Sequence, residues 1–157
     1  MVRVAVGCDH AGLELKRKIV VHLERLGHEV LDLGTNTDDS VDYPTYALAV
    51  GQAVVRGDAD RGILVCKTGA GMSMVANKVP GIRACQVYDP AMAVLSREHN
   101  DANVLALGGG VIDHQMALEA VEVWLHTEYA GGRHEHRLSM IREIERSFLQ
   151  NEPHERS

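Results

Sequence analysis

The chain has 157 residues and a net charge of −6, with 45% hydrophobic but only 4% aromatic residues. This length predicts one domain with a core of its own, built mainly from aliphatic side chains. The negative charge argues against a surface for nucleic acid or for an anionic membrane, and no apolar run is long enough to cross a bilayer. The N-terminus shows no basic-then-apolar leader, and three cysteines without a pairing pattern favour a reducing cytoplasm.

Short apolar runs alternate with amphipathic segments along the chain, and this alternation predicts strands and helices in turn. The predicted strands cover residues 2–8, 28–33, 63–65, 82–87 and 104–107. The predicted helices cover residues 13–26, 45–56, 72–76, 90–98, 114–126 and 133–148. The expected fold is therefore α/β: one Rossmann-like, three-layer domain over residues 1–149, with a five-stranded parallel sheet between helices. Residues 150–157 are expected to form a flexible polar tail.

The stretch from Gly62 to Lys78 holds the most specific local pattern. An apolar strand ends at Cys66, a turn with Gly69 and Gly71 follows, and an apolar helix begins. Amides at such a turn attract negative charge and favour the thiolate of a neighbouring cysteine. Cys66 is therefore a candidate base or nucleophile, with a small buried residue as the common alternative for a strand cysteine. The other two cysteines lack such a neighbourhood and are interpreted as structural.

Polar residues collect where other predicted elements end. Asp9 and His10 follow the first strand at the carboxyl edge of the sheet, where ligands bind in such folds. They fit an acid–base pair or a binder of sugar hydroxyls, and Asp9 also fits a helix cap. A long polar loop over residues 34–44 follows the second strand, and its length hints at function. His99 and Asn100 close a helix, where the dipole favours a histidine and where His99 could also transfer a proton to a substrate oxygen.

Two arginines, Arg133 and Arg137, stand one turn apart at the start of the last predicted helix. The helix dipole disfavours cations there by up to about 1 kcal/mol, so an anionic ligand or a carboxylate on a neighbouring helix or subunit is expected. The nine histidines form no H-E-x-x-H motif, no C-x-x-C occurs, and no dinucleotide fingerprint follows the first strand. The sequence therefore predicts neither a metal nor a cofactor.

Six segments in order resemble the type B ribose-5-phosphate isomerases, a family that includes the subunits of galactose-6-phosphate isomerase. The matching segments are G-C-D-H-A-G-L-E-L-K (7–16), D-Y-P (42–44), G-I-L-V-C-x-T-G-A-G-M-S (62–73), A-N-K-V-P-G-I-R-A (76–84), S-R-E-H-N-D-A-N-V-L-A-L-G (96–108) and G-G-R-H-E-H-R (131–137). The resemblance implies an aldose–ketose isomerase that uses no metal or cofactor. It most directly implies conversion of ribose 5-phosphate to ribulose 5-phosphate, a reaction of the pentose phosphate pathway.

The resemblance also assigns catalytic roles. Cys66 is the base that moves a proton between C2 and C1 through an enediolate, Thr68 assists at the sugar oxygen, and His99 opens the sugar ring. Asp9 is placed with these catalytic residues. The backbone amides that hold the developing negative charge are those of residues 69–73, namely Gly69, Ala70, Gly71, Met72 and Ser73.

The remaining implied roles concern substrate binding and assembly. Asp9 and His10 contact the sugar or its phosphate. Tyr43 and Asn100 line the pocket, and phosphate is bound by Arg133 and Arg137. In this family the last helix packs on a partner subunit, so the implied assembly is a homodimer with a shared active site, with a tetramer as the alternative.

Two positions depart from the pattern of the family. Lys67 follows the base cysteine where the family usually has glycine, and Gly110 stands where it has an arginine that binds phosphate. We therefore count Lys67 among the substrate-binding residues, and expect it to replace part of the missing charge or to lower the pKa of Cys66. The rival expectation is that Lys67 crowds the loop, at a cost of about 1–2 kcal/mol if its φ is positive. Another aldose phosphate as substrate, or a sugar-phosphate sensor without turnover, remain the alternatives.

Overall fold

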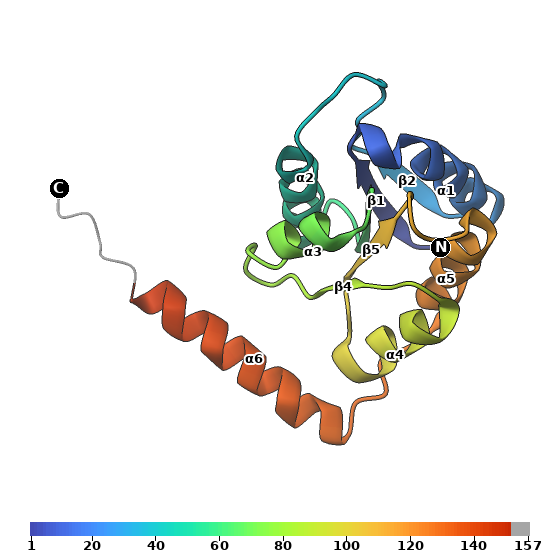
Figure 1. Ribbon diagram of the computed structural model, residues 1–157. Coiled ribbons are helices and arrows are strands. Elements are labelled where there is room, and N and C mark those ends of the chain that lie inside the picture. Colours follow the sequence, from blue (N-terminus) through green and yellow to red (C-terminus); the bar gives the residue numbers. More distant parts are fainter. Residues whose placement is uncertain (152–157) are drawn as a thin grey trace, which may run out of the picture.

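The computed structural model describes residues 1–151 and contains a five-stranded sheet in which every pairing is parallel. Its strands are β1 (Arg3–Cys8), β2 (Glu29–Asp32), β3 (Arg61–Cys66), β4 (Ala84–Gln86) and β5 (Val104–Gly108). The helices are a 3-10 turn η1 (His10–Gly12), α1 (Leu13–Arg25), α2 (Tyr43–Arg56), α3 (Ala70–Ala76), α4 (Pro90–Asn100), α5 (His114–His126) and α6 (Arg133–Gln150). The strand order is β2-β1-β3-β5-β4 (Figure 1). The predicted α/β class and parallel sheet are confirmed.

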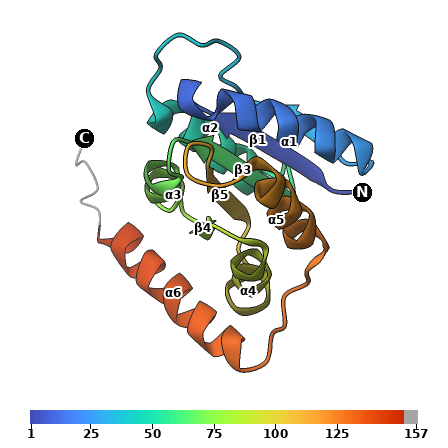
Figure 2. The ribbon, with the colours of Figure 1, turned by 45° about the vertical axis from the view of Figure 1, so that its right-hand side comes forward.

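Helices cover both faces of this sheet (Figures 1 and 2). On one face, α1, α4 and α5 bury a cluster that includes Ile19, Ala93 and Trp124. On the other face, α2 and α3 bury a second cluster that includes Val50 and Met72. The central strands are buried on both sides, which is why they read as continuous apolar runs in the sequence.

Some boundaries differ from the prediction for local physical reasons. β4 is only three residues long because at Arg83 the side chain of Asn103 replaces a ladder bond, accepting the Arg83 amide at 2.7 Å. α2 begins two residues earlier than predicted, since Pro44 in its first turn needs no backbone N–H donor. α4 extends two residues beyond its predicted end at residue 98, through Asn100, so His99 lies inside the helix.

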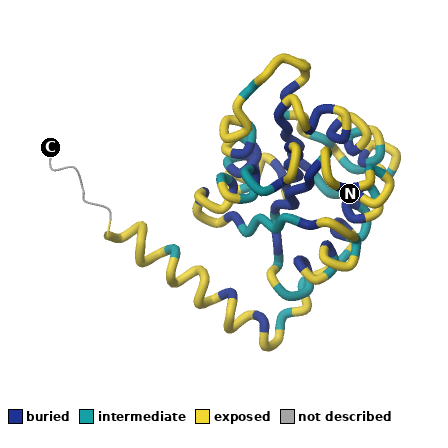
Figure 3. The backbone as a smooth tube through the Cα atoms, in the orientation of Figure 1, coloured by how far each residue is buried: buried dark blue, intermediate teal, exposed yellow. Residues whose placement is uncertain are grey.

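The last helix, α6, leaves the body of the domain (red in Figure 1). Leu138 is buried, and the carboxylate of Glu145 accepts the amide of Gly81 at 3.1 Å. Beyond these anchors, Ile144 and Phe148 are 57% and 74% exposed, and the outer part of α6 is coloured as exposed in Figure 3. α6 thus presents an apolar surface that residues 1–151 leave exposed.

The predicted tail begins inside this helix, because Gln150 is the last residue of α6. Residues 152–157 lie outside the described part of the chain. Within residues 1–151, the structure contains no helix with the length and apolar character needed to cross a membrane.

The strand order creates one reversal point in the sheet. The chain passes from β1 outward to β2, and then returns to place β3 on the opposite side of β1. In open parallel sheets, ligands bind in the crevice beyond the carboxyl ends of two such strands. The ends of β1 and β3, at Cys8 and Cys66, therefore mark the expected position of the site.

Candidate active site

Asp9 lies in the crevice between β1 and β3. Its amide donates to the carbonyl oxygen of Val65 at 3.3 Å, and its Oδ1 accepts the amide of Gly12 at 3.1 Å. Gly12 packs so closely that a Cβ there would lie 2.3 Å from the Val65 oxygen. The interpretation of Asp9 as a cap is therefore confirmed, and the cap holds this buried carboxylate beside the end of β3.

Cys66 ends β3 with its sulfur facing a backbone donor. The amide of Gly69 donates to Cys66 Sγ at 3.1 Å, across a turn in which Gly69 has φ +84°. A hydrogen bond to sulfur stabilises the thiolate rather than the thiol. Cys8, at the end of β1, has the opposite arrangement, because its thiol donates to the carbonyl oxygen of Thr35 at 3.5 Å. Burial raises the pKa of Cys8 to about 11, so the surroundings of Cys8 do not favour a thiolate.

The turn after Cys66 is held by several short contacts. Thr68 Oγ1 accepts the amide of Ala70 at 3.2 Å, and the carbonyl oxygen of Thr68 accepts Nε2 of Gln86 at 2.8 Å. The hydroxyl of Ser73 donates to the carbonyl oxygen of Ala70 at 2.9 Å. These contacts fix the amides around the thiol before any ligand arrives.

Tyr43 and His10 approach this turn from neighbouring elements. The Tyr43 ring packs against Gly71, where a Cβ would lie 2.6 Å from Tyr43 Cζ. His10 Nδ1 accepts the amide of Val41 at 3.1 Å, so in the neutral ring the proton lies on Nε2. His10 is thereby tied to the polar loop that precedes α2.

A buried lysine that was not among the predicted site residues anchors the same loop. Lys16 is 1% exposed, and its Nζ donates to Asp32 at 2.8 Å and to Asn36 at 2.6 Å. Two signals could have found it: Lys16 lies beside the apolar stripe of α1, and it is the last residue of the segment 7–16 that resembles the family. Lys16 is a positioning residue for the loop and not part of the predicted pocket.

The predicted site residues that gather here form what we call the carboxyl-edge half-site: Asp9, His10, Tyr43, Cys66, Lys67, Thr68, Gly69, Ala70, Gly71 and Ser73. The other predicted residues lie elsewhere. Together with His134 they form the amino-edge half-site: His99, Asn100, Arg133, His134 and Arg137.

The two half-sites lie at opposite ends of β3 and β5. α4 runs back from the carboxyl edge, and Asn103, just after it, accepts the amide of Gly62 at 2.9 Å. Cys66 pairs with Gly108 at the far end of the same two strands. Four residues at about 3.3 Å each separate these ends by about 13 Å. One chain therefore does not bring His99 within hydrogen-bond reach of the groups around Cys66.

His134 was missed by the sequence analysis and stands at the centre of the amino-edge half-site. Its ring stacks on that of His99, with centroids 4.3 Å apart and 16° between planes. Burial lowers the pKa of His134, and His99, Arg133 and Arg137 lower it further. Both arginines are exposed, and within residues 1–151 neither takes part in a salt bridge. Among the described residues, Arg133 and Arg137 are therefore exposed cations that no carboxylate pairs with, although Glu98 lies near the His134 ring.

Lys67 does not have the strained backbone that one expectation assigned to it. Among the described residues, Asp101 is the single non-glycine residue with positive φ, at 44°. The expectation of a penalty from positive φ at Lys67 is therefore wrong. Gly69, two residues further, provides the left-handed turn instead.

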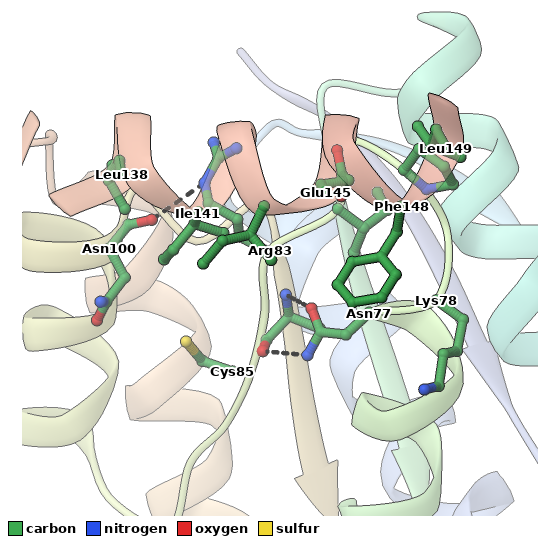
Figure 4. Close-up of a pocket in the computed structure, with 14 residues that line it drawn as sticks. Asn77, Lys78, Arg83, Cys85, Asn100, Leu138, Ile141, Glu145, Phe148 and Leu149 are labelled. Atoms are coloured by element: carbon green, nitrogen blue, oxygen red, sulfur yellow. Dashed lines mark hydrogen bonds between the residues drawn. The ribbon is translucent and has the colours of Figure 1, made fainter. Parts of the chain in front are cut away.

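A groove of about 610 Å³ lies between α6 and residues 77–85, away from Cys66 (Figure 4). Ile141, Ile144 and Phe148 line one wall, and Cys85 and Asn100 contribute to the other. Asn77 fixes that second wall by exchanging two hydrogen bonds with the backbone of Ala84, at 2.8 and 3.0 Å. The groove joins the amino-edge half-site to the exposed apolar surface of α6. In the described part of the chain, no three His, Cys, Asp or Glu side chains are grouped to hold a metal ion.

Comparison with known proteins gives a consistent result. Residues 4–141 match the Ribose/Galactose Isomerase family. The chain is 49% identical to ribose-5-phosphate isomerase B of Escherichia coli over 145 residues, which cover 92% of this chain and 97% of that protein.

Solved structures agree with this match. The structure of ribose-5-phosphate isomerase B of Clostridium thermocellum superposes with a TM-score of 0.92 at 50% identity, covering 93% of this chain and 99% of that one. That of Mycoplasma genitalium, with bound ribulose-5-phosphate, gives 0.88 at 38% identity, covering 92% and 96%. The chain therefore belongs to the ribose/galactose isomerase family and is a sugar-phosphate isomerase.

Proposed function

We propose that this isomerase interconverts ribose 5-phosphate and ribulose 5-phosphate through an enediolate, in a site shared by two copies of the chain. The observation that carries the proposal is the contact between the Gly69 amide and Cys66 Sγ at the reversal point of the sheet. It supports a thiolate base beside fixed amides. The names of the relatives, including one described with ribulose-5-phosphate bound, support the substrate.

In the proposed reaction, the Cys66 thiolate removes the proton from C2 of the open-chain aldose. The electron pair of that bond forms the C1–C2 double bond, and the aldehyde oxygen becomes the enediolate oxygen. The thiol then returns its proton to C1, while the hydroxyl proton on O2 moves to O1 with the help of Thr68. No electrons leave the substrate, so the step needs no oxidant. All three cysteines are free thiols, which supports the cytoplasm as the place of action.

The contacts around the turn narrow the set of amides available for the enediolate. The Gly69 amide already donates to Cys66, the Ala70 amide to Thr68 Oγ1, and the Ser73 amide to the Gly69 carbonyl oxygen. The amides of Gly71 and Met72 lie in the first turn of α3, where helical amides have no intrahelical acceptor. We assign the oxyanion to this pair.

The separation of the half-sites supports a homodimer. A general acid must come within about 3 Å of its target, yet the two ends of β3 that the half-sites adjoin lie about 13 Å apart. We propose that the partner subunit supplies the amino-edge half-site, with His99 opening the ring and Arg133 and Arg137 binding phosphate. The exposed apolar surface of α6 and the groove beside it supply the interface.

The test is an assay of purified protein for conversion of ribose 5-phosphate, with a chelator present. We expect turnover in the chelator, a loss of about a thousandfold or more in Cys66→Ala, and little change in the matched control Cys8→Ala. Folded protein that converts tetrose or hexose phosphates instead would assign a different substrate to the same site. Saturable binding of ribose 5-phosphate without deuterium exchange at C2 would support the sensor and contradict the enzyme mechanism.

A further inference from the structure

The two positions that depart from the family pattern, Lys67 and Gly110, touch each other. The Gly110 amide donates to the Lys67 carbonyl oxygen at 3.0 Å. A Cβ built on Gly110 would lie 3.0 Å from Lys67 Cγ, 3.2 Å from Lys67 O and 3.8 Å from Lys67 Cε. The stem of Lys67 therefore lies over Gly110, in the space where a side chain at position 110 would begin.

The Lys67 ammonium is available for a ligand. The side chain is exposed, and within residues 1–151 Lys67 forms no salt bridge. The other titratable groups of the carboxyl-edge half-site are already engaged. The carboxylate of Asp9 caps η1, the ring of His10 is bonded to Val41, the thiol of Cys66 accepts the Gly69 amide, and the Tyr43 ring packs on Gly71. Lys67 is thus the basic side chain of this half-site that extends from the turn after β3, and it adjoins the thiol residue Cys66.

We propose that Lys67 and Gly110 act as a coupled pair, in which the absence of a side chain at Gly110 lets Lys67 deliver a cation to the phosphate group of the substrate. The inference rests on the proposed function for the identity of the substrate. A phosphate is the anion that a lysine ammonium binds well as a point charge, and the chain as a whole is negative. Lys67 then binds from the carboxyl-edge half-site, opposite the arginines of the partner subunit.

The first test measures binding rather than turnover. Ribose 5-phosphate is titrated by calorimetry into full-length protein carrying Cys66→Ala, with or without Lys67→Met, which keeps most of the stem and removes the charge. We expect Lys67→Met to raise the dissociation constant about tenfold at low salt. The difference between the two dissociation constants should shrink in 0.5 M salt, because the screening length there is only a few ångströms. The matched control Arg25→Met removes a cation from the end of α1, and should leave the constant unchanged.

The second test measures the coupling. Gly110→Arg alone places its Cβ against Lys67 and is expected to weaken the binding of ribose 5-phosphate. The double variant Lys67→Gly/Gly110→Arg should bind ribose 5-phosphate more tightly than Lys67→Gly alone, because the space that Lys67 leaves admits the new arginine. Equal affinity of Lys67→Met and its parent would overturn the inference, as would strictly additive effects of the two substitutions. If Gly110→Arg does not fold, the Lys67→Met comparison still decides.

These outcomes separate the inference from the proposed function. Protein with Cys66 intact that isomerises ribose 5-phosphate, while Lys67→Met binds equally well, would overturn the inference alone. Protein that binds ribose 5-phosphate through Lys67 without isomerising it would overturn the proposed function alone. If neither ribose 5-phosphate nor inorganic phosphate binds, both are overturned.

Discussion

The two half-sites are built in different ways. At the carboxyl edge, backbone and side chains approach so closely that a Cβ at Gly12 or Gly71 would lie 2.3 or 2.6 Å from its nearest neighbour. At the amino edge, a Cβ at Gly131 or Gly132 would meet nothing within 4 Å, and the arginines that follow are exposed. Proton transfer depends on positions held within fractions of an ångström, whereas charge attraction tolerates adjustment. Under the proposed function, this difference means that one chain alone prepares the base, whereas the anion site would be completed only when two chains assemble.

The largest expected effect tests whether the two half-sites of an active site come from different chains. Cys66→Ala damages one half-site and His99→Asn the other, so each variant alone should be almost inactive. Mixed and allowed to exchange subunits, they should regain about a quarter of wild-type activity, because about half the dimers are hybrids with one intact site each. The measurement is ribose 5-phosphate turnover before and after exchange.

The control pairs two variants of the same half-site, Cys66→Ala with Thr68→Ala. Their hybrids contain no intact site, so this mixture should stay inactive. Recovery of activity in the control mixture would contradict the shared site. So would the absence of recovery in the first mixture, because it would mean that the two half-sites of one active site come from the same chain.

A smaller effect is expected from crowding the carboxyl edge. Gly71→Ala places a methyl group against the Tyr43 ring, which is 38% exposed and can rotate away. Alanine is also the better helix former, so thermal stability should barely change while kcat/KM falls about tenfold to a hundredfold. Gly57→Ala is the matched control. Gly57 has a φ of +81° and a Cβ there would meet no atom within 4 Å, so this variant should lose about 1 kcal/mol of stability through backbone strain and keep its activity. Unchanged kcat/KM in Gly71→Ala would show that Tyr43 need not be held in place.

The smallest expected effect is a pH dependence of the amino edge. Because the folded state holds the pKa of His134 below its ordinary 6.5, the unfolded chain takes up that proton more readily. The free energy of unfolding should therefore fall as the pH drops below about 6.5, and be unaffected by this group above that pH. Glu98 opposes the shift, and His28, whose pKa is also lowered, titrates in the same window. The measurement is the urea midpoint of unfolding at pH 7.5 and at pH 5.5. The midpoint should drop more between these two pH values in the wild type than in His134→Phe, which keeps an aromatic ring. An equal drop in both proteins would contradict the assignment of this pH dependence to His134.

The fold was largely predictable because the strands are buried on both faces and read as apolar runs between amphipathic helices. Cys66 and Asp9 were recognisable for the same reason, since each directly follows such a run. The edge at which His99 lies could have been predicted as well: a helix that follows a parallel strand returns to the amino edge, and His99 is near the end of α4. The contact between Lys67 and Gly110 could not, because it depends on how closely the turns after β3 and β5 approach.

The opposite placement of Cys66 and His99 has a consequence for how the rate should scale with the amount of protein. If every working site needs two chains, an isolated chain contributes nothing, and dilution below the dissociation constant of the dimer should reduce the specific activity rather than leave it constant. In that regime the rate rises with the square of the protein concentration, and substrate that bridges the two chains shifts the balance back by mass action. The substrate would then promote assembly of the catalyst that consumes it.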